Sequence, residues 1–283
     1  MEIVKTERQW QLATNARGRE GGLASVHPVI AELLWQRGIR TEDEAERFLE
    51  PKYDRDIHDP FLFRDMGRAV DRIFGAFKNG EHITIHGDYD ADGVTGSAVL
   101  MSALTDISRR EGTVANVDFY VPHREREGYG LHDATVDLLK ERGTNLIITV
   151  DCGIACRDAI SRAKNYGIDT IVVDHHEFPS ELPDAILIHP RLAGEAYPFP
   201  YLAAVGVAWK VACALYARAR ERGLEVSPYA EKWLLDLVAI ATVTDVMPLV
   251  GENISYVCSA SRSFVIVMLK TAFSPYTMRS LIG

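Results

Sequence analysis

Residues 82–93 read HITIHGDYDADG, and this stretch decides the fold. Its first half is an apolar run typical of a buried strand, and the turn that follows carries His86, Asp88, Asp90 and Asp92 at alternate positions. A helix N-terminus favours negative charge, which explains a single acid at such a turn. Four acidic and histidine side chains alternating in one turn favour a binding site instead.

Short apolar runs and amphipathic helices continue to alternate after this stretch. Strands are expected at 82–86, 117–121, 146–150, 170–173 and 185–188, and helices at 94–109, 132–142, 155–166, 202–222 and 227–246. This alternation indicates a parallel sheet covered on both faces. The sequence therefore predicts an α/β fold with a doubly wound, mainly parallel sheet and helices on both of its faces.

Residues 1–80 are expected to form a helical N-terminal preface. An apolar helical run covers 29–35, and Thr41 and Glu44 have the spacing of a capping box, in which each side chain binds a backbone amide of the other. A third apolar helical face, beginning near Met66, ends at Asn79-Gly80, a sequence that suits a helix end.

The length, composition and net charge of the chain exclude several classes of protein. The 283 residues allow one large domain or two small ones. With 47% hydrophobic and 25% charged residues, the chain is neither disordered nor collagen-like. The net charge of −9 is opposite to the basic field expected of a nucleic-acid or membrane binder. A polyanionic substrate would therefore have to be held by local cations or by metal.

The cysteines and the N-terminus favour a cytoplasmic chain. The four cysteines lack the CxxC spacing of a zinc site and are too few for a disulfide framework. Charged residues interrupt the first eight positions, so no secretory signal is expected. No run reaches the roughly 18 apolar residues that a membrane span needs.

Three of the predicted strands run directly into acids or histidines. The first leads into the turn 86–93, the third into Asp151, and the fourth into Asp174-His175-His176. Ligands of open parallel sheets bind beyond the carboxyl ends of the strands, so these side chains should gather at one edge. Close carboxylates raise one another's pKa unless a cation neutralises them, and a metal site is expected. Carboxylates and imidazoles without thiolates suit Mn²⁺ or Mg²⁺ and leave Zn²⁺ and Fe²⁺ open.

Asp245 is a fourth candidate, at the end of a long apolar helix. A carboxylate buried there would need a partner, which a metal would supply. A solvated helix end before Pro248 is the alternative.

Together these motifs resemble, in order and approximate spacing, the four motifs of the DHH phosphoesterase superfamily. The DYDADG form is similar to the RecJ branch, the single-strand-specific 5′→3′ DNA exonucleases. The resemblance covers about residues 25–253. Its motifs are HGDYDADG at 86–93, VDCG at 150–153, DHH at 174–176 and TD at 244–245, with further RecJ-like segments at 34–38, 48–51, 59–60, 127–131 and 204–210.

The resemblance implies two divalent cations, Mn²⁺ or Mg²⁺, in a DHH phosphoesterase domain. One would be held by His86 and Asp90, the other by Asp92, His175 and Asp245, with Asp151 bridging them. The catalytic residues would be Asp90, Asp92, Asp151, His175 and His176. Asp88 and Asp174 would contact the ligands rather than the cations. Alternatively, Asp88 and His176 would face the substrate.

Four residues after the second strand are candidates for substrate binding. His123, Arg124 and Arg126 could contact phosphates, or form a solvated basic loop. Tyr129 could stack on a base, or serve packing. The implied partner is single-stranded DNA, together with a single-strand-binding protein or a helicase. The chain is expected to be a monomer without a membrane partner.

Three segments are predicted: the preface 1–80, a DHH core 81–253, and a divergent tail 254–283. RecJ-like chains usually continue into a DHH-associated domain and an OB-fold, so the tail is expected to lead toward an absent C-terminal domain. The implied function is metal-dependent exonuclease action that releases 5′-mononucleotides in DNA repair and recombination. The alternatives are another phosphohydrolase of the superfamily, acting on oligonucleotides, cyclic dinucleotides or pyrophosphate, and a non-catalytic RecJ-like binding module.

Overall fold

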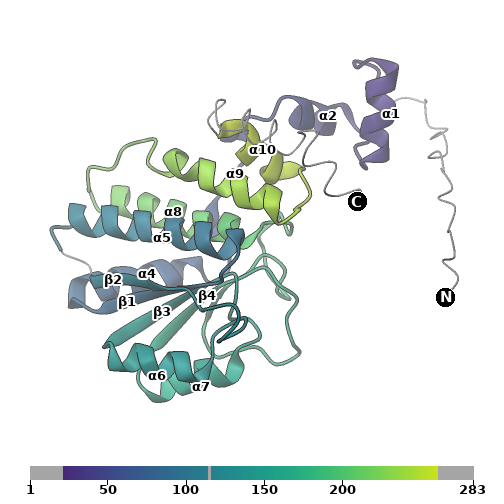
Figure 1. Ribbon diagram of the computed structural model, residues 1–283. Coiled ribbons are helices and arrows are strands. Elements are labelled where there is room, and N and C mark those ends of the chain that lie inside the picture. Colours follow the sequence, from purple (N-terminus) through teal and green to yellow (C-terminus); the bar gives the residue numbers. More distant parts are fainter. Residues whose placement is uncertain (1–21, 114–115, 261–283) are drawn as a thin grey trace, which may run out of the picture. The chain divides into compact units, whose positions relative to one another are not determined.

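The computed structural model describes residues 22–113 and 116–260 (Figure 1). The chain divides into two compact units, one ending at Pro51 and one beginning at Lys52. The predicted boundaries at 80 and 253 remain predictions, and the predicted tail lies outside the described residues from position 261 onward.

The first unit contains two short helices around a small apolar cluster. Helix α1 (Pro28–Gln36) and helix α2 (Glu42–Leu49) contribute the buried residues Leu34 and Ala45. The Thr41 hydroxyl accepts a hydrogen bond from the Glu44 N–H, and the Glu44 side chain accepts one from the Thr41 N–H, at 3.2 and 3.0 Å. The capping box predicted from the sequence is therefore present.

The second unit is built on a five-stranded parallel sheet in the order β2-β1-β3-β4-β5. Its strands are β1 (His82–Gly87), β2 (Asn116–Tyr120), β3 (Thr144–Val150), β4 (Asp169–Val173) and β5 (Ile186–Ile188). Its helices are α3 (Tyr53–Asp56), η1 (Pro60–Leu62), α4 (Met66–Asn79), α5 (Ala91–Arg110), α6 (Asp133–Glu141), α7 (Arg157–Asn165), α8 (Ala204–Glu221), η2 (Glu231–Leu234), α9 (Leu235–Thr244) and α10 (Gly251–Ser259).

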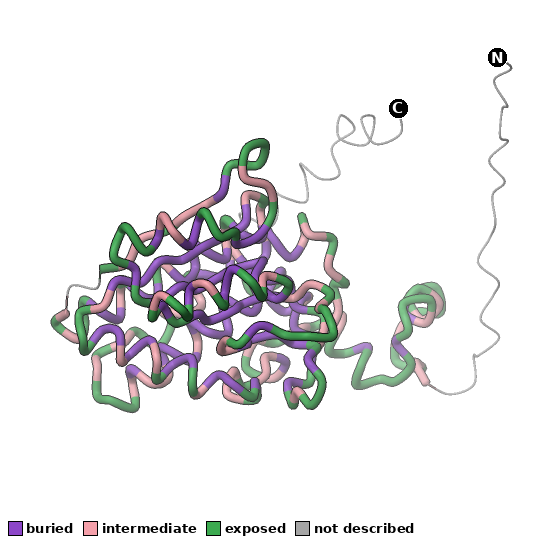
Figure 2. The backbone as a smooth tube through the Cα atoms, turned by 90° about the horizontal axis from the view of Figure 1, so that it is seen from below, coloured by how far each residue is buried: buried purple, intermediate pink, exposed green. Residues whose placement is uncertain are grey.

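Helices cover both faces of this sheet, as the sequence predicts (Figure 1). Successive strand residues point to opposite faces. Ile148 accordingly joins the cluster formed with α4, α5, α8 and α9, whereas its neighbour Ile147 joins the cluster formed with α6 and α7. The central strands are buried along nearly their whole length (Figure 2), which explains their continuous apolar sequences.

The strand order reverses beside β1. The chain steps from β1 outward to β2, and then returns to place β3 on the other side of β1. In an open parallel sheet the crevice at such a reversal, beyond the carboxyl ends of the strands, is where ligands bind. The acidic turn after β1 and Asp151 after β3 flank this position.

Two predicted helices differ from the observed ones. Helix α5 begins at Ala91 rather than 94, because the Asp90 carboxylate caps it by accepting hydrogen bonds from the N–H groups of Asp92 and Gly93. The predicted helix 227–246 is instead a turn, the 3₁₀ segment η2 and helix α9. The carbonyls of Ser227 and Glu231 accept hydrogen bonds from the Arg220 and Trp209 side chains, which lie outside that segment.

Among the described residues, none of the helices combines the length and the apolar character that a membrane crossing requires.

A buried ion pair links three parts of the second unit. Lys210 on α8 and Glu252 on α10 are both fully buried, with Nζ and Oε2 2.8 Å apart. Lys210 also donates to the His58 carbonyl at 2.6 Å, and Glu252 accepts from the His58 N–H at 3.1 Å and from the Tyr197 hydroxyl at 2.5 Å. Each charge is therefore compensated by several partners, as burial requires.

Replacing Lys210 alone should destabilise the fold. Lys210→Met leaves the Glu252 carboxylate buried without its cation, so we expect the free energy of unfolding to fall by about 3–5 kcal/mol. Urea denaturation followed by circular dichroism measures this. The Lys210→Met/Glu252→Gln double variant, which removes both charges, should lose less than the single variant. A double variant as unstable as the sum of the two single variants would contradict this role for the pair.

Candidate metal centre

The backbone ladder of the sheet brings three aspartates to one edge. The N–H groups of Asp88, Asp151 and Asp174 each donate to the last residues of the neighbouring strand, at 3.2, 3.0 and 3.3 Å. Each acid thus follows its strand directly and is held at the same level as the other two. The expectation that these strand ends meet at one edge is confirmed.

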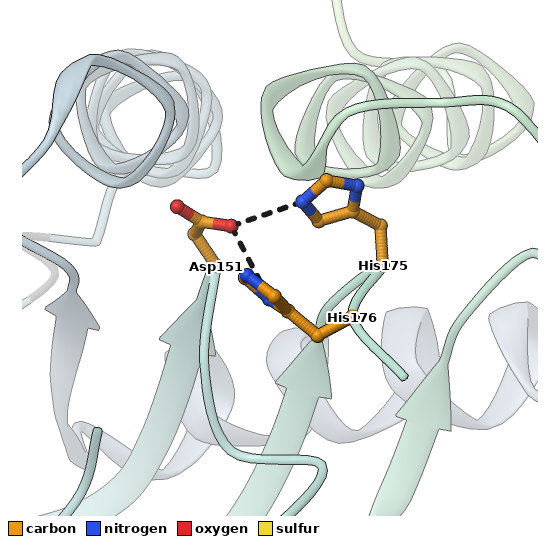
Figure 3. Close-up of side chains that lie close together, drawn as sticks. All are labelled: Asp151, His175 and His176. Carbon is orange, nitrogen blue, oxygen red and sulfur yellow. Dashed lines mark ion pairs between the residues drawn. The ribbon is translucent and has the colours of Figure 1, made fainter. Parts of the chain in front are cut away.

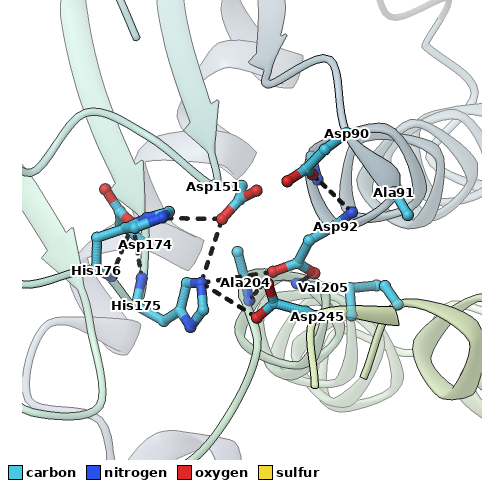
Figure 4. A network of polar contacts seen from close by, with 12 residues as sticks. Asp90, Ala91, Asp92, Asp151, Asp174, His175, His176, Ala204, Val205 and Asp245 are labelled. Atoms are coloured by element: carbon cyan, nitrogen blue, oxygen red, sulfur yellow. Dashed lines mark hydrogen bonds and ion pairs between the residues drawn. The ribbon is translucent and has the colours of Figure 1, made fainter. Parts of the chain in front are cut away.

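The turn after β1 is held from two sides. Asp90 caps α5, as described above, and Asp92 is buried at the start of that helix. The two carboxylate oxygens of Asp92 accept hydrogen bonds from the N–H groups of Ala204 and Val205, at 2.7 and 2.8 Å (Figure 4). These N–H groups lie at the N-terminus of α8, where no helical carbonyl is available to them and where negative charge is favoured. The position of the carboxylate is thereby fixed from a second element.

Asp151 adopts a strained backbone conformation. Its φ of 62° lies in the left-handed region, which residues other than glycine rarely occupy. The Tyr129 hydroxyl donates to its carbonyl at 3.0 Å. Two residues later, Gly153 has a φ of 110°, and a Cβ there would lie 2.4 Å from the Thr149 hydroxyl. Such strain persists only where the surroundings hold it, and it is typical of functional positions.

Three groups of carboxylate and imidazole ligand atoms converge at this edge, each within 4.8 Å. Asp151 belongs to two of the groups, and so does His175. Figure 3 shows Asp151 after its strand facing the two histidines that follow β4. The groups are Asp88 with Asp90 and Asp151, Asp151 with His175 and His176, and Asp92 with His175 and Asp245.

His175 lies at the centre of the cluster. Its Nε2 is 3.3 Å from Asp151 Oδ1 and 3.7 Å from both Asp92 Oδ2 and Asp245 Oδ2 (Figure 4). Asp245 arrives from the end of α9, so residues more than 150 positions apart meet here. The sequence-based candidates Asp90, Asp92, Asp151, His175 and Asp245 therefore all lie together.

His176 is oriented by Asp174. The Asp174 Oδ1 atom lies 2.9 Å from His176 Nδ1 and accepts hydrogen bonds from the N–H groups of His175 and His176. Burial would raise the pKa of Asp174, but these bonds and one from the Ile154 N–H hold it below its usual value. The hydrogen bond to Asp174 raises the pKa of His176 to about 9, so its imidazole carries a proton at neutral pH.

His86 is close to the cluster in sequence but stands outside its three groups. It is fully buried, with Nδ1 3.5 Å from the Cys152 sulfur, and burial lowers its pKa to about 4. Its Nε2 has no hydrogen-bond partner among the described residues. A buried, neutral imidazole with an unpartnered nitrogen has the chemistry of a metal ligand.

The cluster holds more carboxylates than its surroundings can keep ionised without a cation. Burial, with the nearby charges of Asp92 and Asp90, raises the pKa of Asp151 to about 10. Burial also raises the pKa of Asp92 to about 6, and raises the pKa values of Asp88 and Asp245. Buried oxygens of Asp88 and Asp151 accept no hydrogen bond within the described chain. Divalent cations match this set of hard oxygen and imidazole ligands.

The predicted substrate contacts lie in and after the loop that follows β2, here called the basic rim, and two of them contact residues of the site. His123, Arg124 and Arg126 are exposed in the loop after β2, and the Arg124 guanidinium lies 5.2 Å from the centre of the Tyr89 ring. The Tyr129 hydroxyl lies 3.1 Å from His176 Nδ1. Tyr129 is thus attached to the cluster itself, and 44% of it remains exposed.

Sequence reasoning missed the amides of Ala204 and Val205. A helix was predicted to begin near residue 202, and a helix start always offers free N–H groups. No pattern in the sequence indicates that these groups face Asp92, more than 110 residues away.

Without metal, the folded protein should lose stability as pH rises. Unfolded aspartates ionise near pH 4, whereas Asp92 and Asp151 ionise near 6 and 10 in the fold. Their contribution is complete below about pH 4 and is lost as pH rises through these higher values. His176 acts in the same direction, because its raised pKa stabilises the fold below about pH 6.5 and the effect is lost through pH 9.

We therefore expect the melting temperature in a chelating buffer to fall between about pH 6 and pH 9. Asp151→Asn, which cannot ionise, should show a flatter dependence by differential scanning fluorimetry. Asp158→Asn, at an exposed position in the first turn of helix α7, is the matched control. Parallel curves for the protein and Asp151→Asn would contradict the raised pKa.

Comparison with known proteins agrees with this geometry. The chain is 44% identical to the single-stranded-DNA-specific exonuclease RecJ of Bacillus subtilis over 89% of its own length and 30% of that protein. It is 37% identical to RecJ of Salmonella typhimurium over 81% of its own length and 39% of that protein. The chain thus spans about a third of the length of these relatives.

Solved structures of RecJ exonucleases are also similar to this chain. A manganese-bound exonuclease RecJ superposes with a TM-score of 0.61 at 28% identity, covering 75% of this chain and 53% of that one. RecJ of Thermus thermophilus in complex with Mn²⁺ superposes with a TM-score of 0.63 at 26% identity, covering 85% and 33%. The family model described as DHH family, N-terminal domain, matches residues 82–242, from the first strand of the sheet almost to Asp245. This chain belongs to the DHH family.

Proposed function

We propose that this chain is the catalytic part of a metal-dependent exonuclease that acts on single-stranded DNA from the 5′ end and releases 5′-mononucleotides. The observation that carries the proposal is the sharing of ligands: Asp151 and His175 each belong to two of the three groups. Two-metal phosphodiesterases hold two neighbouring ions in this manner. The similarity to RecJ exonucleases supports the choice of single-stranded DNA as substrate.

Two divalent cations, Mn²⁺ or Mg²⁺, fit the residues present. Asp90, with His86 through its unpartnered Nε2, would hold one, and Asp92, His175 and Asp245 would hold the other. Asp151 would bridge the two, and Asp88 would lie beside it. When bound, such a pair activates a water and offsets negative charge on the phosphodiester oxygens.

The protein's own groups would orient the substrate and carry protons. His176 is held through Nδ1 by Asp174, which leaves Nε2 free to hold a proton and deliver it to the leaving oxygen. Arg124, supported by the ring of Tyr89, with His123 and Arg126, would bind phosphates at the rim. Tyr129, half exposed beside His176, would stack on a base.

The proposed function also includes a location in the cell and partner proteins. We place the chain in the cytoplasm, acting as a monomer in DNA repair and recombination. A single-strand-binding protein or a helicase would supply the exposed strand. The acidic net charge makes the bound cations and the basic rim the main source of affinity for DNA.

The first test is hydrolysis of a 3′-labelled single-stranded DNA with Mn²⁺ and with chelator. We expect Mn²⁺-dependent shortening from the 5′ end, and at least a thousandfold slower hydrolysis by Asp151→Ala, because this change removes a ligand shared by both cations. Duplex DNA should resist. Turnover of only an RNA dinucleotide or pyrophosphate would indicate another phosphohydrolase, and bound metal without turnover a binding module. Retained hydrolysis by Asp151→Ala would refute the two-metal assignment.

A second test counts the metal ions. Asp245→Ala removes one ligand from the group with Asp92 and His175, so it should weaken the binding of one Mn²⁺ about 10–100-fold and leave the other unchanged. Isothermal titration calorimetry measures both affinities. Asp236→Ala, on the same helix, is the matched control. Equal Mn²⁺ stoichiometry and affinity in Asp245→Ala and the parent would count against this ligand.

A further inference from the structure

Two loops that are distant in sequence determine where the ligands of one group lie. The loop 199–203 leads into α8, whose first N–H groups fix the Asp92 carboxylate. The loop 246–250 follows Asp245 directly. A shift of either loop would move one carboxylate of the Asp92–His175–Asp245 group.

Asn253 joins these two loops through a single amide. It is fully buried in the first turn of α10, and its Nδ2 donates to the Tyr201 carbonyl at 2.7 Å and to the Pro248 carbonyl at 3.0 Å. Both neighbours are carbonyl oxygens, so the nitrogen of the amide must face them. One hydrogen of the amide therefore bonds to a carbonyl of each loop.

The loop after Asp245 begins with a strained backbone conformation. Val246 has a φ of 56° and is 85% exposed, although β-branched residues strongly disfavour the left-handed region. The end of a helix usually places glycine at this position. Little of the Val246 side chain is packed, so backbone bonds hold the conformation: the N–H groups of Val246 and Met247 donate to the Val243 and Thr242 carbonyls, at 3.2 and 3.1 Å. The Asn253 side chain adds a bond to the Pro248 carbonyl two residues beyond Val246.

The start of α10 is itself firmly anchored. Its first residue, Gly251, packs so closely on Phe199 that a Cβ would lie 2.6 Å from the ring. The next residue, Glu252, is the buried partner of Lys210. Asn253 therefore extends from a fixed point on the body of the unit to both loops.

We propose that Asn253 is a positioning residue that sets the spacing of the Asp92 and Asp245 carboxylates, and through it the affinity of that group for a divalent cation. Asn253 is not itself a member of any of the three ligand groups. The inference rests on the proposed function, since it assumes that the group binds a metal. Residues that orient ligands from behind typically change metal affinity 10–100-fold when they are replaced.

The experiment titrates the whole chain, freed of metal by dialysis against chelator, with Mn²⁺ alone by isothermal titration calorimetry. Asn253→Ala should weaken one of the two Mn²⁺ sites at least tenfold and leave the other within about twofold. Ser255→Ala is the matched control, because Ser255 is also buried two residues further along α10 and its hydroxyl donates to the Gly251 carbonyl within its own helix. It should retain both affinities. Asn253→Ser, which keeps one donor, should fall between them.

The outcomes separate the two proposals. If the parent binds no Mn²⁺, the proposed function and this inference both fail. If the parent binds two ions and Asn253→Ala matches Ser255→Ala, only the role of Asn253 is overturned. A merely structural asparagine would lower the melting temperature of the metal-free protein without weakening one Mn²⁺ site selectively.

A measurement on the parent protein keeps the inference testable if the variants do not fold. Hydrogen exchange followed by mass spectrometry should show that Mn²⁺ protects the segments 199–205 and 246–253 together, because one amide links them. Protection of the first segment without the second would overturn the coupling.

Discussion

Carboxylates crowded at the edge of a parallel sheet are the constraint on which the rest of this structure depends. Asp88, Asp151 and Asp174 are placed there by the strand ladder, and Asp92 and Asp245 are brought to the same point by helices. Such a concentration of buried charge opposes folding unless each group is hydrogen-bonded, protonated or bound to a cation. The helix N-terminus at Ala204, the imidazole of His175 and the protonated His176 each compensate part of it. The fold therefore fixes the positions of the carboxylates and histidines. The carboxylates that lack a partner in the fold favour the binding of a cation.

Much of this arrangement could be predicted from local sequence. Strands such as 146–150 are continuous apolar runs because both faces of the sheet are covered, and parallel strands end at a common edge. Those two facts suffice to bring the turn after β1, Asp151 and the Asp174-His175-His176 segment together. Asp245 could be singled out because an acid interrupts so apolar a helix. The capping box at Thr41 and the helix end at Gly80 are equally local, and both are present.

The remainder depends on contacts between segments far apart in the chain. Nothing near Asp92 indicates that two amides of α8 bind it, and nothing near Asn253 indicates that its side chain links two loops. The segment 227–234 is predicted to be helical, yet it forms a turn and a 3₁₀ segment, in which the Ser227 and Glu231 carbonyls accept hydrogen bonds from the side chains of Arg220 and Trp209. His86 has the position of a ligand in the sequence, whereas its burial against Cys152, outside the three groups, is a property of packing. In each case the deciding partner lies on another element.

The bond between Asp92 and the start of α8 has a consequence for the ribosome-bound chain. The acidic turn leaves the exit tunnel long before Ala204 and Val205, and Asp245 follows later still. Contacts of such high sequence separation form late in folding. During synthesis the nascent protein therefore exposes several unneutralised aspartates beside a half-built sheet, with no complete cation site. The Asp92–His175–Asp245 group is therefore complete only after residue 245 has been synthesised and α8 and α9 have packed against the turn that carries Asp92.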